Sequence, residues 1–464
     1  MLKKEEKKNY NLLKIIGAIF LLFAVLTWII PAGSFSSSEF SKGEITPVGL
    51  YGIFKTPVYS FAVFAQYFIL ILCVGGFYGV MNKTSVYQRI VEFFVKKSKI
   101  GFLISTVIIF ALITSIFGET MMVFVLIPFF ITVLLKHGFS RVVSLASTVG
   151  ASLIGMSASI CGNLAIYKNY FNLEGNTSII YNIILLMILV FLLIMFIIPK
   201  TKDSVKNNDI PLYIEEKSCK KSVVPFIIII IVTVLLLILG LYNWYYSFDI
   251  SIFNDFNTWL SEIKLFNTDI FTKIFGEILN IGYFNNYDIS IILVISSAII
   301  AWIYNVKFNE YIDSFKNGAK ETIIPAFYVV LASLIFSSMV TSNSGNISLT
   351  ISNFILGLSK NFNIFTGVLT SIFGSFFYND YLYLMNGLYN KISLYDSADM
   401  PIILNVFQSI YGVMMMILPV SITLIFGFKF VGVTYKEWFK FIWKFLIQVF
   451  AIVIIGAIIL NMVV

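Results

Sequence analysis

Long runs of hydrophobic residues, separated by short polar segments, dominate the chain. A helix needs about 20 consecutive apolar residues to cross the hydrocarbon core of a bilayer. The runs lie at 12–30, 58–81, 100–117, 121–135, 142–166, 179–198, 223–241, 289–306, 323–340, 347–358, 364–377, 402–426 and 439–463. The pattern therefore predicts an all-α integral membrane protein with about ten spanning helices.

The amino-acid composition agrees with this fold class and argues against a water-soluble or a nucleic-acid-binding protein. Of the 464 residues, 59% are hydrophobic and 12% are charged, whereas a soluble domain is about 25% charged. The net charge of +8 is modest, and it gathers in loops instead of on one face of a domain. A water-soluble protein and a nucleic-acid-binding protein are therefore both excluded.

The signs of the loops predict the orientation of the chain. Lysines are concentrated in the N-terminal tail, in 83–97 and in 200–222, whereas the 247–288 segment is mainly acidic. By the positive-inside rule, the N-terminus and the 200–222 loop are cytoplasmic and 247–288 is external. We expect a multi-pass protein of the bacterial cell (plasma) membrane. Four aromatic residues are interpreted as interfacial: Tyr167, Tyr170, Trp302 and Trp438.

A five-residue sequence, Thr-Ser-Ile-Phe-Gly, occurs twice, at 114–118 and at 370–374. Basic residues flank the first copy at both ends, whereas Lys360 precedes the second copy and Asp396 and Asp399 follow it. Both copies are therefore expected in re-entrant hairpins, near 100–135 and 362–391, that enter from opposite faces. This is the inverted-repeat architecture of secondary transporters, with two repeats that each hold a hairpin and a broken helix. The length of the 100–117 run leaves a full membrane crossing open there.

The repeat also suggests how the chain is organised. We predict five segments: 1–31, a tail and the first spanning helix; 32–199, the first repeat; 200–222, a cytoplasmic linker; 223–320, connecting helices with the acidic external loop; and 321–464, the second repeat. A cleaved signal peptide is an alternative interpretation of the first run.

Two acids follow the hairpin motifs and are the first candidates for a substrate site. Glu119 comes directly after Gly118, and Asp380 stands slightly further beyond the second motif. A charge at mid-bilayer costs about 2.5–3.5 kcal/mol on insertion scales, so such residues are usually functional. Either acid could instead lie in water at the end of a shorter helix.

Small and polar residues at the expected helix breaks complete the candidate site. An unwound midpoint offers carbonyls and helix ends to a substrate or an ion, although close helix packing also uses small residues. The candidate substrate-binding residues are Ser115, Gly118, Glu119, Thr120, Ser159, Gly162, Asn163, Ser342, Asn343, Ser344, Asn346, Tyr378, Asn379, Asp380, Pro419 and Ser421.

Three local motifs resemble those of a known family. They are Leu26–Gly33 (LTWIIPAG), Pro47–Tyr51 (PVGLY) and Val433–Trp438 (VTYKEW). The chain is similar almost end to end to the YfcC-type carriers, which are grouped with the C4-dicarboxylate anaerobic carriers in the ion-transporter superfamily. The resemblance implies inverted repeats, hairpins and broken helices. It also implies a choice of substrate, because relatives include arginine/ornithine antiporters as well as carriers of organic anions.

Charge favours the first of these substrates. No arginine lies inside an apolar run, although a dicarboxylate site needs arginine forks or helix N-termini. Glu119, Asp380 and neighbouring tyrosines are suited instead to a cationic amino acid. We therefore predict arginine/ornithine exchange by alternating access. The alternative is Na⁺- or H⁺-coupled transport of C4-dicarboxylates or other small organic anions.

Other function classes lack the residues that they require. There is one histidine, His137, and three separated cysteines, so we expect no metal site, no cofactor and no enzymatic activity. A channel would need a filter-like repeat or rings of charge, which the sequence lacks. The expected partners are a small-molecule substrate and membrane lipid, with no nucleic acid. A homodimer is left open.

Overall fold

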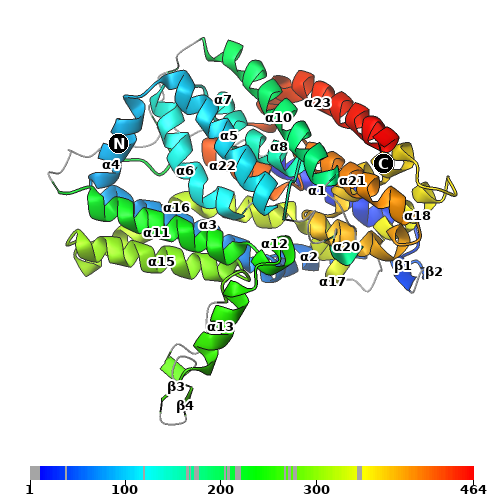
Figure 1. The fold of residues 1–464 in the computed structure, drawn as a ribbon, viewed down its shortest axis with the longest axis horizontal. Helices are drawn as coiled ribbons and strands as arrows, with labels where there is room; N and C mark the ends of the chain where they lie inside the picture. The colour runs from blue at the N-terminus through cyan, green and yellow to red at the C-terminus, as the bar shows by residue number, and fades with distance from the viewer. Residues whose placement is uncertain are drawn as a thin grey trace. The chain divides into compact units, whose positions relative to one another are not determined.

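The computed structural model describes residues 11–36, 39–118, 121–162, 167, 169–171, 177–202, 205, 209–214, 221–265, 268–269, 273–274, 280–341 and 347–463. The chain forms two compact units. We call Ile69–Ile323 the central unit, and Met1–Phe68 together with Ile324–Val464 the terminal unit. Figure 1 labels their elements, and each unit is described by itself.

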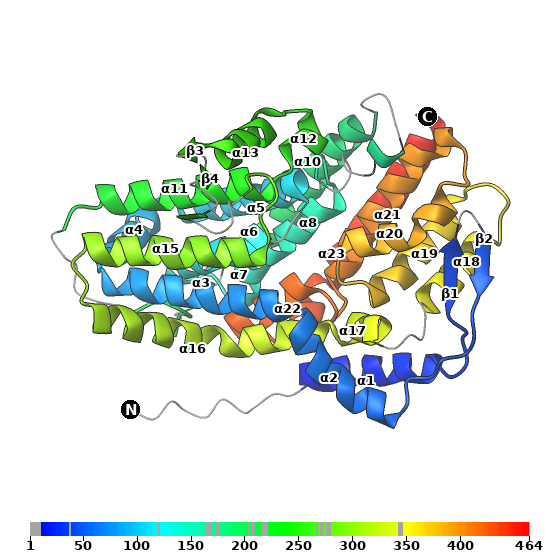
Figure 2. The ribbon, with the colours of Figure 1, turned by 90° about the horizontal axis from the view of Figure 1, so that it is seen from below.

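The central unit is built almost entirely from helices. In chain order its elements are most of α3 (Ala65–Lys83), α4 (Val86–Val95), α5 (Lys99–Phe117), α6 (Met121–Lys136), α7 (Arg141–Leu145), the π-helical turn η1 (Ala146–Gly150), α8 (Ala151–Ser157), α10 (Thr177–Ile197), η2 (Ile198–Thr201), α11 (Val224–Leu241), α12 (Trp244–Phe248), α13 (Ile252–Glu262), β3 (Lys264–Leu265), β4 (Thr268–Asp269), α15 (Asn286–Ile303) and the first part of α16 (Phe308–Ala332). Helix α5 packs against α6, η1, α8 and α10, and α11 packs against α15. Helices α3, α11, α15 and α16 run side by side in Figures 1 and 2.

The terminal unit joins the start of the chain to its last third. It holds α1 (Asn11–Leu26), β1 (Gly33–Ser36), β2 (Glu39–Lys42), α2 (Leu50–Val63), the beginning of α3, the end of α16, α17 (Leu334–Thr341), α18 (Ile347–Leu356), α19 (Ile364–Phe377), α20 (Tyr381–Ile392), η3 (Ser397–Asp399), α21 (Met400–Met415), α22 (Ile422–Val431) and α23 (Tyr435–Val463). Strands β1 and β2 pair antiparallel, with Gly33 opposite Lys42. Helix α19 packs between α18 and α21, and α21 also contacts α23.

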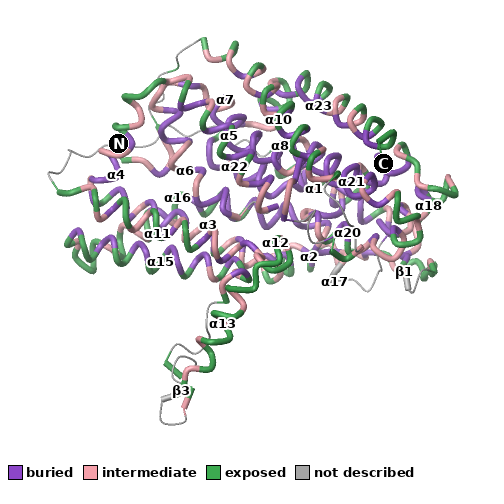
Figure 3. The backbone as a smooth tube through the Cα atoms, in the orientation of Figure 1, coloured by how far each residue is buried: buried purple, intermediate pink, exposed green. Residues whose placement is uncertain are grey.

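The expected fold class is confirmed: this is an all-α protein with membrane-spanning helices. Within the described residues, six helices are long and apolar enough to cross a bilayer. They are α3, α5, α10 with η2, α11, α15 and α23, and six shorter apolar helices accompany them. Figure 3 shows the contrast between α22, which is largely buried, and the exposed α13.

Local sequence explains where several helices begin. Ser98, Asn363 and Ser421 each accept a hydrogen bond from a backbone N–H in the first turn of α5, α19 and α22, respectively. Asn285 and Asp288 form a reciprocal capping box at the start of α15. Such caps satisfy donors that have no partner inside the helix, and water cannot do this within a bilayer.

Two predicted runs are not single helices. The 58–81 run is divided between α2 and α3 at Phe64, and the 323–340 run is divided between α16 and α17 at Ser333. Hydropathy averages over a whole span, so an apolar residue at a break leaves no signal in it. In the 323–340 run, by contrast, the break falls at a polar residue, Ser333.

The two expected hairpins differ in length. In the second, α19 has 14 residues and α20 has 12, and both are shorter than the roughly 20 residues that a crossing needs. In the first, α5 has 19 residues and is long enough to span. The motif copies also sit differently, because α5 ends at Phe117, within its copy, whereas α19 continues to Phe377, beyond its copy.

Candidate substrate site

In the central unit, Ser115 joins the end of α5 to the segment that follows α8. Its hydroxyl donates to the carbonyl of Ala158 at 2.5 Å, and its own carbonyl accepts from the backbone N–H of Ile160 at 2.9 Å. Helix α8 ends at Ser157, so these bonds satisfy backbone groups that no helix satisfies. The non-helical segment predicted around residues 155–163 is therefore present from Ala158 to Gly162.

Two glycines meet where this segment approaches the end of α5. Gly118 (φ +68°) and Gly162 (φ +61°) both have left-handed backbone conformations. A Cβ on Gly162 would lie 2.7 Å from the Gly118 nitrogen and from the Phe117 carbonyl oxygen. Only glycine permits this approach, because any other residue would clash with the backbone. Ser159 is buried here and donates to the Cys161 carbonyl.

The structure thus brings Ser115, Gly118, Ser159 and Gly162 together. Seven other predicted residues lie outside the described part of the chain: Glu119, Thr120, Asn163, Ser342, Asn343, Ser344 and Asn346. For these the site assignment stays a prediction.

In the terminal unit, α19 is held to α21 much as α5 is held to α8. The Ser371 hydroxyl, at the position in the motif that Ser115 occupies in the first copy, donates to the Phe407 carbonyl at 3.0 Å. Tyr378 follows directly after α19 and is buried. Its carbonyl accepts from the hydroxyl of Tyr411 on α21 at 3.3 Å. The end of α19 is therefore fixed against a neighbouring helix.

Asp380 and Asn379 occupy the turn between α19 and α20. The Asp380 carboxylate caps α20 by accepting from the Leu382 N–H at 2.8 Å. Among the described residues, no lysine, arginine or histidine forms an ion pair with it. The Asn379 amide donates to the Ser333 hydroxyl at 2.7 Å. Because Ser333 separates α16 from α17, the hairpin tip meets a second helix break.

The break at Pro419 and Ser421 is present, and both residues are buried. Helix α21 ends at Met415 and α22 begins at Ile422. Side chains of α23 satisfy carbonyls that the break frees: Trp438 Nε1 donates to Met416 at 2.8 Å, and the Tyr435 hydroxyl donates to Ile417. Irregular backbone is stable inside a membrane protein when its polar groups are satisfied in this way.

These contacts correct one interpretation of the aromatic residues. Trp438 is 0% exposed and Tyr167 is 1% exposed, so neither is an interfacial anchor. Trp438 supports the helix break, and Tyr167 is covered by protein. Trp302 and Tyr170 remain exposed.

Sequence reasoning missed Lys429. It is the one residue of α22 that is not fully buried, and its Nζ lies 3.8 Å from the centre of the Tyr328 ring. No described acid forms an ion pair with it. The sequence feature that could have revealed it is a lysine within the apolar segment Phe426–Phe430, just beyond the predicted 402–426 run. Asn405 and Ser409 were also missed; both are buried on α21, and their side-chain oxygens form no hydrogen bond with a described residue.

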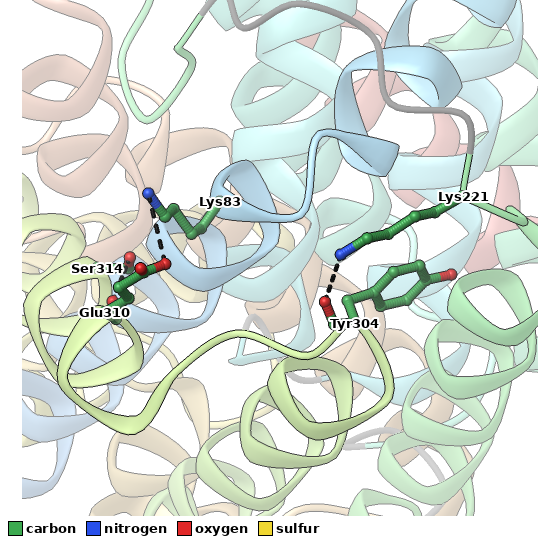
Figure 4. A network of polar contacts seen from close by, with 5 residues as sticks. All are labelled: Lys83, Lys221, Tyr304, Glu310 and Ser314. Carbon is green, nitrogen blue, oxygen red and sulfur yellow. Dashed lines mark hydrogen bonds and ion pairs between the residues drawn. The ribbon is translucent and has the colours of Figure 1, made fainter.

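A second polar region lies in the central unit, between α3, α16 and residues 212–214. It contains a cavity of about 320 Å³ lined by Asn82, Lys83, Glu310, Asp313 and Glu321, among others. Lys83 pairs with Glu310 at 3.8 Å, and the Ser314 hydroxyl donates to the Glu310 carbonyl (Figure 4). Nowhere in the described part of the chain do three or more His, Cys, Asp or Glu residues form a group able to hold a metal ion.

The fold and these broken helices define a class of protein, namely a multi-pass helical membrane protein with irregular backbone buried between its helices. The comparison with protein families identifies which one. Residues 11–462 match the model of the DcuC family, described as C4-dicarboxylate anaerobic carrier. The chain belongs to this family. It is therefore a membrane transporter, and the family is one of carriers and not of enzymes.

The other two comparisons add little. No curated protein matches the chain. Among solved structures, the YdaH transporter of Alcanivorax borkumensis, described as having an unusual topology, is similar over 96% of this chain and 97% of its own. The sequence identity is 11% and the TM-score is 0.39. The family assignment rests on the sequence match.

Proposed function

We propose that the protein exchanges cationic amino acids, with arginine and ornithine as the pair, by alternating access. The observation that carries this proposal is the carboxylate of Asp380. It lies at the tip of a hairpin too short to span, in a transporter, and no described cation neutralises it. Substrate sites in such carriers are formed at broken helices near the bilayer midplane.

The cap that Asp380 forms is compatible with this role. Its Oδ1 atom accepts from the N–H of Leu382, which fixes the orientation of the side chain. A backbone donor carries no net positive charge, so it does not neutralise the carboxylate as a lysine or an arginine would. Oδ2 has no hydrogen bond from a described residue and is available to a guanidinium or ammonium group.

Aromatic residues around Asp380 support the same substrate class. Tyr383 and Tyr411 interact electrostatically with its carboxylate. Tyr383 is 48% exposed, and its ring centre lies 4.8 Å from that of Phe336. Aromatic faces attract guanidinium and ammonium groups, and the attraction is stronger where water is excluded.

Counterflow in proteoliposomes tests the proposal. Vesicles loaded with ornithine should take up labelled arginine, and empty vesicles should not. Asp380→Asn should reduce exchange at least tenfold, because asparagine caps a helix as well as aspartate but carries no charge. Asp396→Asn is the matched control, since Asp396 caps η3 at an exposed site. Equal exchange by wild type and Asp380→Asn would reject the proposal.

Glu119→Gln extends the test to the first repeat. If Glu119 binds substrate, exchange should be lost over the whole pH range. If it carries a coupling proton, net uptake driven by a pH gradient should be lost while exchange persists. Unchanged transport in both assays would remove Glu119 from the site.

A second candidate function is the Na⁺- or H⁺-coupled transport of C4-dicarboxylates, which the family description favours. The supporting observation is Lys429, a cation in a buried helix without a described acid partner. Lysine is a common ligand of anionic groups. Under this function, dicarboxylate uptake should occur without internal ornithine and should be lost in Lys429→Gln but not in Lys444→Gln.

We also propose that the transporter lies in the bacterial plasma membrane with its N-terminus in the cytoplasm, since the loop charges support this orientation. In a variant whose three native cysteines are replaced by serine, cysteines introduced at Ser247 and at Ser222 should be labelled by an impermeant maleimide from the outside only and the inside only, respectively. The opposite labelling would reverse the orientation. Cross-linking in native membranes would separate a homodimer from a monomer.

A further inference from the structure

Helix α13 is amphipathic, and three of the five residues on its apolar face are exposed in the described part of the central unit. The apolar residues of α13 are Ile252, Phe253, Phe256, Trp259 and Leu260, which fall on one side of the helix at i, i+1, i+4, i+7 and i+8. Ile252 is 65% exposed, Phe256 42% and Trp259 58%. The opposite side carries only polar and acidic residues.

Hydrogen bonds and a ring contact fix helix α13 to the rest of the central unit. Both polar atoms of the Asn257 side chain bond the backbone of Ile281, at 3.1 and 3.2 Å. The Phe253 ring lies 5.4 Å from Trp244, whose Nε1 donates to the carbonyl of Leu239 on α11. A well-fixed helix that presents three large apolar side chains outward is typical of a surface that binds a partner.

The connections of α13 place it at the end of two spanning helices. The Phe284 N–H donates to the Gly240 carbonyl at 2.9 Å, which holds the end of α11 beside the approach to α15. Ile281, which Asn257 binds, precedes the start of α15 by five residues, which is at most about 18 Å of extended chain. Helix α13 therefore lies near the level at which these helices leave the bilayer, and it projects sideways from them (Figures 1 and 3).

Exposed aromatic residues lie at the same ends of α11 and α15. Around the ends of α11 and α15 the exposed residues are Tyr245, Tyr246, Phe248, Tyr283 and Tyr287. Tyrosine and tryptophan are enriched where a membrane protein crosses the headgroup region. The exposed face of α13, with Trp259, extends this aromatic surface outward from the spanning helices.

We propose that α13 is an interfacial helix whose apolar face inserts into the lipid leaflet at the α11–α15 end. The only charged residues on α13 are Asp255 and Glu262. Its attraction to the membrane therefore comes from the burial of Ile252, Phe256 and Trp259 and not from anionic lipid. Inserted in this way, helix α13 holds the α11–α15 end of the central unit in that leaflet.

Spin-label accessibility in the full-length protein tests this. A p-acetylphenylalanine introduced at Phe256 or Trp259, on the apolar face, or at Asn254 or Thr258, on the polar face, is coupled to a nitroxide, which leaves the native cysteines unchanged. In phosphatidylcholine vesicles, labels at 256 and 259 should be accessible to oxygen and protected from a water-soluble nickel chelate. Labels at 254 and 258 should show the reverse. Adding phosphatidylglycerol should change neither result.

A second variant separates insertion from misfolding. Trp259→Glu should expose the label at 256 to the nickel chelate, and Thr258→Glu, on the polar face, should not. Equal nickel accessibility on both faces would overturn the proposal. Protection of position 256 from both reagents, with dipolar broadening that disappears on dilution with unlabelled protein, would also overturn it by showing that a second copy covers the face. Neither result depends on the transported substrate.

Discussion

The hydroxyl of Ser115 donates to the carbonyl of Ala158, and these two residues join the end of α5 to the non-helical segment after α8. Both residues are buried. Because the carbonyl of Ala158 lies beyond the end of its helix, the serine supplies the hydrogen bond that a helix would have supplied. This contact holds the two elements on which the first half of the candidate site is built.

Ser115→Ala should therefore destabilise the central unit and impair transport. Leaving a buried carbonyl unsatisfied costs about 1–3 kcal/mol, so the melting temperature in detergent should fall. Ser157→Ala is the matched control, since among the described residues the Ser157 hydroxyl donates to the Leu153 carbonyl within its own helix. Equal melting temperatures for the two variants would contradict this role of Ser115.

Gly162→Ala should abolish transport. Its effect on the stability of the fold should be smaller. The left-handed backbone at Gly162 costs roughly 1–2 kcal/mol for an L-residue, and the new methyl group would overlap Gly118 and Phe117. The end of α5 and the non-helical segment would then be forced apart. Gly17→Ala is the control, because a Cβ there meets nothing within 4 Å. Transport rate and melting temperature, measured on both variants, test the expectation, and wild-type transport by Gly162→Ala would refute it.

Trp438→Phe should weaken the break between α21 and α22. The substitution keeps an aromatic ring but removes the donor to the Met416 carbonyl. The expected cost is again about 1–3 kcal/mol, because that carbonyl is freed from its helix inside the protein. Trp443→Phe, at a site that is 42% exposed, should be nearly neutral. Thermal unfolding in detergent measures both, and similar losses would indicate a general aromatic effect.

His137 should make the protein less stable in acid. It lies in the turn between α6 and α7, where burial and the nearby Lys99 lower its pKa. The unfolded chain therefore binds more protons than the folded chain around and below about pH 6.5. Stability is lost as the pH falls through that range, and His137→Gln should remove part of the loss. Melting temperatures at about pH 5.5 and pH 7.5 test this, and an unchanged difference between them would contradict it.

Several features of the candidate site could be predicted from the sequence because their signals are local. The Pro419–Ser421 break combines a residue that lacks an N–H with a helix-capping hydroxyl. Asp380 was recognisable as a carboxylate beside an apolar run. The contribution of Trp438 was not recognisable, because a tryptophan near a helix end looks like an interfacial residue until the packing of α23 against α21 is known.

Lys429 was missed because its tertiary contact cannot be predicted from the sequence around it. In the sequence it stands near the end of an apolar run, where a lysine usually extends its side chain to the interface. Its position over Tyr328 depends on the packing of α22 against α16, and these helices are far apart in the sequence. No local pattern encodes that contact.

The sequence by itself determined the membrane-embedded helical fold, most of the apolar helices and the residue types available for substrate. These follow from the hydrophobicity of short stretches, which the bilayer selects directly. Only the tertiary structure decided which polar groups meet: Ser115 with Ala158, Gly118 with Gly162, and Trp438 with the break at Met416. Such contacts form between segments brought together by packing, and they arise because every backbone group away from water needs a partner.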